Sequence, residues 1–209
     1  MSGERTYQSP LREAQAAMTR ERILMAAKDY LEQHSIDSLT LRKVAALSGV
    51  SPPTVYSHFP AMDDLVGAFF LWLKPRVAFD KPPPPLAELH TMPARQFPLY
   101  EQHGALLRNL MNQSSWDRNR YADRDNRLSG WAKAVSQELP NLTPTQLRRG
   151  GLACASFWSP TYWRWLRDTC CFSPEEAKTV ATWGIRAVIT ALKTDAAGLD
   201  QPLPGATSR

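Results

Sequence analysis

The chain has 209 residues, of which 43% are hydrophobic and 22% charged, a composition typical of globular proteins. No segment stays apolar for the roughly 18 residues that a membrane-spanning helix needs, and no apolar block near the N-terminus precedes a small-residue cleavage site. We therefore expect a cytoplasmic protein with no membrane partner. The formal net charge of +5 and a pI near 9.3 permit binding to a polyanion without establishing it.

The first helices are marked by residues that start and stop helices. Apolar residues recur at the helical period along the chain, and no alternating strand pattern is present, which predicts an all-α fold. After a polar arm, Thr19 is expected to cap the first helix. Thr40 is expected to cap a short second helix, which Gly49 would end in the left-handed conformation. Ser51 is then expected to cap a third helix that has Pro52 at its first position.

The rest of the chain continues in the same helical pattern. A fourth helix is expected to start after Pro60 and to stop at Pro75, ahead of a polyproline connector over residues 81–86. Pro98 is expected to open the next helix, and a charged helix is expected over residues 116–139. Two capping boxes with proline at the first helical position predict the last two helices: Thr143 to Gln146 and Ser173 to Glu176.

Together these signals predict an N-terminal three-helix domain, with two short helices joined by a glycine turn, followed by a larger helical domain. The expected boundaries are a flexible arm at 1–18, the three-helix domain with its connecting helix at 19–73, the larger helical domain at 74–197, and a disordered tail at 198–209.

The cysteines and histidines form no pattern typical of a disulfide framework or a metal site. Cys170 and Cys171 are adjacent, a spacing that strains a disulfide between them, and the four histidines have no short-range pairing. We expect no metal and no cofactor, and we interpret the three cysteines as packing residues.

Residues 40–59 combine a compact helix, a glycine turn and a second helix, the arrangement of a helix-turn-helix. If Val55 and Phe59 face the core, the helical period leaves Pro53, Thr54 and Ser57 outward, where small side chains allow approach to base edges. Tyr56 and His58 flank this face as donors for phosphate oxygens, and the helix N-terminus near Ser51 is a further anion site. The alternative is a structural helical hairpin with half-buried Tyr56 and His58.

This segment, with its turn glycine, its Tyr56-x-His58-Phe59 ending and the downstream Asp64-Leu65, resembles the TetR family of repressors over about residues 19–73. The resemblance implies a ligand-responsive repressor that binds a palindromic DNA operator as a homodimer and is released by a small apolar or aromatic effector. A lysine is common in the family where this chain has Met62, so one phosphate contact is expected to be missing. The DNA-binding candidates are Arg42, Ser51, Pro52, Pro53, Thr54, Tyr56, Ser57 and His58.

For the C-terminal region, the resemblance implies an effector pocket and a dimer interface made by the last two helices. Most of the tryptophans lie there, and a core is the alternative use for such side chains. The candidate pocket residues are Phe97, Tyr100, His103, Leu107, Met111, Trp131 and Trp158. A stripe of small residues favours close helix packing across a two-fold axis, or else packing within the chain. The candidate interface residues are Leu147, Gly151, Cys154, Trp158, Ala177, Ala181, Gly184, Val188 and Ala191.

Two other classes of protein remain as alternatives at this stage. An all-helical enzyme would need a nucleophile with a base, paired carboxylates, a metal site or a phosphate loop, and none of these patterns is present, so we expect no enzyme. An architectural or effector-independent DNA-binding protein would share the helix-turn-helix and lack an effector cavity.

The run 117–127 alternates in charge and is interpreted as a solvated helix face.

Overall fold

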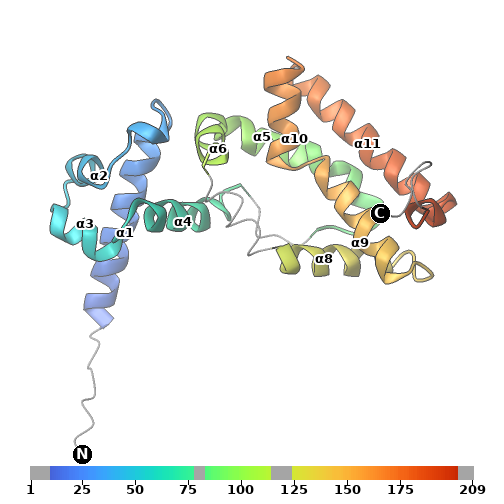
Figure 1. Cartoon of the computed structure of the whole chain (residues 1–209), viewed down its shortest axis with the longest axis horizontal. Helices are drawn as coiled ribbons and strands as arrows, with labels where there is room; N and C mark the ends of the chain where they lie inside the picture. Colours follow the sequence, from blue (N-terminus) through green and yellow to red (C-terminus); the bar gives the residue numbers. More distant parts are fainter. Residues whose placement is uncertain (1–9, 78–82, 114–123, 202–209) are drawn as a thin grey trace, which may run out of the picture.

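The computed structural model describes residues 10–77, 83–113 and 124–201, and within these residues it contains helices and no strand, which confirms the all-α prediction. In Figure 1 the first helices form one group and the later ones another, and α4 runs from the first group toward the second. The N-terminal elements are α1 (Pro10–Leu31), the 3-10 turn η1 (Ile36–Ser38), α2 (Leu41–Ser48), α3 (Pro52–His58) and α4 (Met62–Leu73).

Local capping fixes the short helices of the N-terminal domain. The Thr40 hydroxyl accepts a hydrogen bond from Lys43 N at 3.2 Å, and Gly49 ends α2 with φ of 64°, as the sequence predicts. In α4, the Asp64 carboxylate accepts from Ala61 N at 2.9 Å and so caps its start. These helices enclose an apolar core, whose buried members include Ile23, Leu24, Ala27, Val44, Val55, Phe59 and Leu65.

The predicted start of the first helix is wrong. Helix α1 begins at Pro10, inside the segment expected to be an arm, and Thr19 lies in its interior, where its hydroxyl donates to Gln15 O at 2.9 Å. A threonine can bond backwards within a helix as well as cap one, so its presence alone does not mark a boundary. Residues 11–18 have exposed side chains, and no apolar stripe therefore signals this part of the helix.

The C-terminal helices pack around α5 and α11 (Figure 1). The elements are η2 (Leu86–Thr91), α5 (Met92–Gln102), α6 (Gly104–Met111), α8 (Arg124–Ser136), α9 (Pro144–Ser156), α10 (Pro160–Arg164), the π-helical turn η3 (Trp165–Thr169), α11 (Pro174–Thr194) and η4 (Ala196–Leu199). Both predicted capping boxes, at Thr143 with Gln146 and at Ser173 with Glu176, are confirmed.

Of two helix starts predicted in this region, the one at Pro98 is wrong and the one at residue 116 lies outside the described residues. Pro98 does not open a helix, because α5 begins at Met92 with Pro93 in its first turn, and Pro98 lies inside it. The chain bends instead at His103, between α5 and α6. The charged helix predicted from residue 116 begins in a segment that the structure does not describe, and its described part starts at Arg124.

The C-terminal end and the cysteines also differ from expectation. Residues 198–201, assigned to a disordered tail by sequence, include the end of η4 (Ala196–Leu199). Gln146 Nε2 of α9 donates to Asp200 Oδ2 at 2.7 Å and so binds this segment to α9. Cys154 is a packing residue as predicted, and burial raises the pKa of its thiol to about 12. Cys171 is exposed and has φ of 55°, so the packing interpretation is wrong for it.

The stripe of small residues on α9 and α11 packs within the chain. Ala177, Ala181 and Gly184 are buried, and a Cβ at Gly184 would lie 2.3 Å from the Phe157 ring. Gly150 is equally close to Leu192, where a Cβ would lie 2.5 Å from Cδ2. The small side chains therefore let α11 approach α9 of the same chain.

We expect Gly184→Ala to lower the free energy of unfolding by about 1–2 kcal/mol, because the added methyl group would displace the Phe157 ring. Helix propensity alone would give the opposite result, a gain of about 1 kcal/mol. Chemical denaturation at matched protein concentration measures the difference. In the background Phe157→Leu, which frees space above residue 184, the loss is expected to shrink; a stabilised Gly184→Ala single variant would contradict the close packing.

Candidate nucleic-acid interface

Helices α2 and α3 are held at their turn by α1. Arg22 of α1 donates from Nη2 to Ser48 O at 2.8 Å and to Gly49 O at 3.4 Å, the last residue of α2 and its C-cap. This charged donor satisfies carbonyl groups at a helix end that lack helical partners. The turn between the two helices is therefore fixed to α1.

Helix α3 buries one face and exposes the other, as the sequence predicts. Val55 and Phe59 are 0% and 1% exposed and belong to the apolar core. The predicted DNA-binding candidates lie together outside this core. Ser51, Pro52, Pro53, Tyr56 and Ser57 are exposed, while Thr54 and His58 are half-buried.

The start of α3 differs in detail from the prediction. Ser51 occupies the N-cap position, but its hydroxyl pairs with the Thr54 hydroxyl at 2.8 Å and caps no backbone N–H. Pro52 and Pro53 have no N–H, and Val55 N already donates to Ser51 O. The helix N-terminus is therefore a weaker anion site than its sequence predicts, because the backbone N–H of Thr54 is its remaining amide donor.

Arg42 and Lys43 are neighbours at the start of α2 with different roles. Lys43 Nζ donates to Tyr30 Oη at 2.9 Å and to Ser38 O at 2.8 Å, and its hydrogen bond holds the pKa of Tyr30 below the usual value. Arg42 is exposed and forms no hydrogen bond or ion pair with the described residues. Of the two cations, Arg42 is available to an outside anion.

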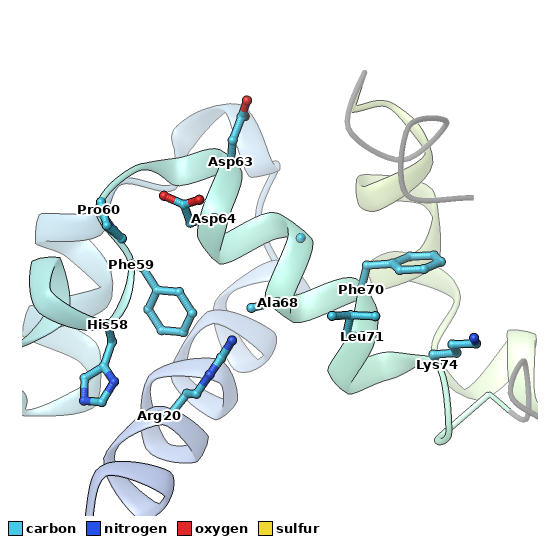
Figure 2. Close-up of a pocket in the computed structure, with 11 residues that line it drawn as sticks. Arg20, His58, Phe59, Pro60, Asp63, Asp64, Ala68, Phe70, Leu71 and Lys74 are labelled. Carbon is cyan, nitrogen blue, oxygen red and sulfur yellow. The ribbon is translucent and has the colours of Figure 1, made fainter. Parts of the chain in front are cut away.

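A groove of about 640 Å³ runs between α1, the end of α3 and α4 (Figure 2). Arg20 and His58 lie at one end, with the Arg20 guanidinium 4.8 Å from the centre of the Phe59 ring. Stacking on an aromatic ring orients a guanidinium while leaving its donors available. Arg20 is thus a candidate site residue that sequence reasoning missed, because its contact with Phe59 joins residues far apart in the chain.

The predicted effector-pocket residues lie mainly in the core. Phe97, Tyr100 and Leu107 are at most 1% exposed, and Tyr100 Oη donates to Trp158 O at 3.0 Å. Trp158 is buried, and Met111 is half-buried. Trp131 lies in α8, but its side chain is outside the described residues. Core packing, the alternative left open by sequence, accounts for Phe97, Tyr100, Leu107 and Trp158.

His103 lies where α5 meets α6, and its surroundings are those of the junction with α1. The pKa of His103 lies below its usual value, mainly because the side chain is partly buried and secondly because Lys28 of α1 is positively charged. The side chain is half-buried.

Among the described residues no three His, Cys, Asp or Glu side chains gather as metal ligands, and no described helix is long and apolar enough to cross a membrane.

The chain is similar to one family model and to several solved structures. Residues 23–69 match the family model described as bacterial regulatory proteins, tetR family. A tetR-family transcriptional regulator from Streptomyces coelicolor has a similar fold, with a TM-score of 0.59 and 19% identity over 91% of this chain and 92% of that one. NalD of Pseudomonas aeruginosa, described as the secondary repressor of the MexAB-OprM multidrug efflux pump, has a TM-score of 0.56 and 17% identity over 83% and 96%.

Salmonella enterica GusR is similar in fold as well, with a TM-score of 0.55 and 19% identity over 89% of this chain and 97% of that one. No curated protein matches the chain by sequence. The family match covers the helix-turn-helix and its flanking helices, and the fold similarity extends over the C-terminal helices. Residues 23–69 are therefore similar to the bacterial regulatory proteins of the tetR family, and the chain as a whole has the fold of these solved regulators.

Proposed function

We propose that the chain is a ligand-responsive transcriptional repressor that acts in the cytoplasm, binds a palindromic operator as a homodimer and is released by a small apolar or aromatic effector. The observation that carries the DNA-binding part is the exposed surface of α3, next to the unpaired Arg42, inside the segment that matches the family. NalD is described as a repressor, which favours repression over activation by analogy.

The proposed DNA contacts divide by chemistry. Arg42, Tyr56 and His58 supply donors for phosphate oxygens, and Arg20 joins them from the groove beside His58. Pro52, Pro53, Thr54 and Ser57 form the part of α3 that faces base edges. Because the prolines donate no hydrogen bonds, sequence preference depends on Thr54, Ser57 and the shape of the DNA.

The proposed dimer uses a face of α9, η3 and α11 that the chain leaves uncovered. Most of the stripe predicted for the interface, including Gly151, Cys154, Ala177 and Ala181, is buried against the chain itself, whereas Leu147, Val188 and Ala191 reach the surface. Large apolar side chains protrude beside it: Trp183 is 72% exposed, Trp165 50% and Leu152 42%. Exposed tryptophan and leucine on adjacent helices suit a self-complementary two-fold contact.

The effector is proposed to bind among the buried aromatic residues around Phe97, Tyr100, Met111 and Trp158. Since Phe97 and Tyr100 are packed in the core, a ligand would enter by displacing side chains that now contact each other. An effector-independent DNA-binding protein is the second candidate, and the same tight packing favours it. Ligand titration distinguishes the two, because a sensor is stabilised by its ligand through mass action.

We expect Arg42→Ala to weaken binding to all DNA sequences and to reduce the slope of log affinity against log salt by about 1.8, because each subunit of the dimer loses one phosphate contact. The operator for this test is a duplex selected from a random library with the wild-type protein, and fluorescence anisotropy measures affinity at several salt concentrations. Lys43→Ala is the matched control: it should lower stability by about 1 kcal/mol while keeping the wild-type slope. An unchanged slope for Arg42→Ala contradicts its role.

We expect Trp183→Glu to convert the homodimer to monomer at micromolar concentration, because a carboxylate would replace a large apolar anchor at the centre of the contact. A loss of about 2 kcal/mol or more corresponds to a dissociation constant raised roughly 30-fold. Size-exclusion chromatography with light scattering measures the mass. Leu71→Glu, at a similarly exposed position on α4 (65%), should leave the mass unchanged; a Trp183→Glu variant that stays dimeric places the interface elsewhere.

We expect a small apolar or aromatic compound that raises the melting temperature of the protein to weaken operator binding. A coupling of about 1–3 kcal/mol changes operator affinity roughly 5- to 150-fold, and bound operator must weaken the compound's affinity by the same factor. Calorimetric titration into the free protein and into the operator complex compares the two affinities. Equal affinities would show that the compound does not regulate DNA binding.

A further inference from the structure

Asn109 of α6 joins the C-terminal domain to the end of α1. Its Nδ2 donates to Leu31 O at 2.8 Å and to His34 O at 3.0 Å, and its Oδ1 accepts from Ile36 N at 3.2 Å. Leu31 is the last residue of α1, and Ile36 is the first of η1. One side chain therefore binds three backbone groups where α1 ends and the path to α2 begins.

The chemistry of this contact is specific to an amide. Carbonyl groups at a helix C-terminus have no partner within the helix, so an outside donor must satisfy them. A side-chain amide provides two N–H donors and one carbonyl acceptor, which matches two backbone carbonyls and one backbone N–H. A carboxylate would place negative charge against both carbonyls, and alanine would leave all three groups without this partner.

Helix α1 in turn carries the DNA-reading unit, by which we mean α1, α2 and α3. Arg22 binds the turn between α2 and α3, and Lys43 of α2 donates to Tyr30 of α1. Ile23 and Leu24 belong to the same buried core as Val44 of α2 and Val55 of α3. A rotation of α1 therefore moves the recognition helix α3 with it.

A second contact holds α1 near its middle. Trp72 Nε1, in α4, donates to both carboxylate oxygens of Glu21 at 2.8 Å, and Arg76 Nη2 donates to the same carboxylate at 3.1 Å. Leu31 is ten residues further along, which at 1.5 Å per residue is about 15 Å. If Glu21 is the pivot, a shift of about 1 Å at the Leu31 end rotates the unit by about 4°.

We infer that Asn109 is the positioning residue that fixes the orientation of the DNA-reading unit relative to the C-terminal domain, and with it the separation of the two recognition helices in the dimer. This inference rests on the proposed function as a dimeric DNA-binding protein. Asn109 itself contacts no DNA. Its substitution should therefore change which half-site spacing is bound, since two-fold related recognition helices match half-sites at one separation.

The test compares Asn109→Ala with Asn112→Ala. Asn112, the C-cap of α6, accepts from Arg164 Nη1 at 3.0 Å, so its side chain bonds within the C-terminal domain. Affinities are measured for the palindromic duplex selected with the wild-type protein and for duplexes with half-sites one base pair closer or further apart. We expect the wild-type protein and Asn112→Ala to lose at least about 10-fold on the altered spacings, and Asn109→Ala to lose less than about 3-fold.

The shape of this spacing profile separates positioning from stability. If Asn109→Ala weakens all three duplexes by the same factor, or matches the wild type, the inference is overturned while the proposed function stands. If the wild-type protein selects no duplex, the proposed function fails and the inference with it. If circular dichroism shows that Asn109→Ala does not fold, the same affinities are measured for Asn109→Gln. This variant keeps the amide but adds a bond of about 1.5 Å to the side chain, and an unaltered spacing profile would overturn the inference.

Discussion

The C-terminal end of α1 is the point on which the arrangement of the two domains depends. The apolar side chains of α1 are buried in the core of the DNA-reading unit: Ile23, Leu24, Ala27 and Leu31. Burial of each large side chain among them stabilises the folded state by about 1.5–3 kcal/mol. The same helix ends against the Asn109 amide of α6. Burial fixes α1 within its own domain, and hydrogen bonds fix the whole unit against the other one. Since hydrogen bonds need a narrow range of distance and angle, whereas apolar contact does not, the second attachment sets the orientation.

Helix α3, the proposed recognition helix, is short and rigid and leaves few groups available to DNA. Pro52 and Pro53 restrict the backbone of its first turn, and Val55 and Phe59 anchor it from below. The same two prolines remove amide donors, and the hydroxyls of Ser51 and Thr54 bond to each other. An approaching duplex would have to replace that bond with its own, at little net cost because both hydroxyls remain rotatable. The surface is therefore preorganised in shape more than in hydrogen bonding.

The features that sequence predicts well are those fixed by neighbouring residues. Thr40, Gly49 and the two capping boxes act within one helical turn, and the buried pair Val55 and Phe59 follows from a spacing of four residues. Thr19 and Pro98 mislead because either residue is tolerated inside a helix when packing elsewhere supports it. Contacts such as Arg20 over Phe59, or Asn109 on Leu31, join residues far apart in the chain. No local pattern predicts them, since each depends on how two helices are placed.

A path by which a ligand could act on DNA binding follows from the connections of α5. Helix α11 packs against α5, which bears Phe97 and Tyr100, and α5 passes through the bend at His103 directly into α6. Arg108 of α6, five residues after His103, donates two hydrogen bonds of 2.7 and 2.5 Å to the Asp168 carboxylate. These hydrogen bonds lower the pKa of the Asp168 carboxyl and fix α6 to η3. Asn109, the next residue, holds α1. A ligand that displaced Tyr100 would therefore have to move α6 against the Arg108 ion pair, and any movement that succeeded would reach α1 through the adjacent side chain. Helix α6 thus joins η3, part of the surface proposed for the dimer, to α1 through two consecutive polar residues, Arg108 and Asn109.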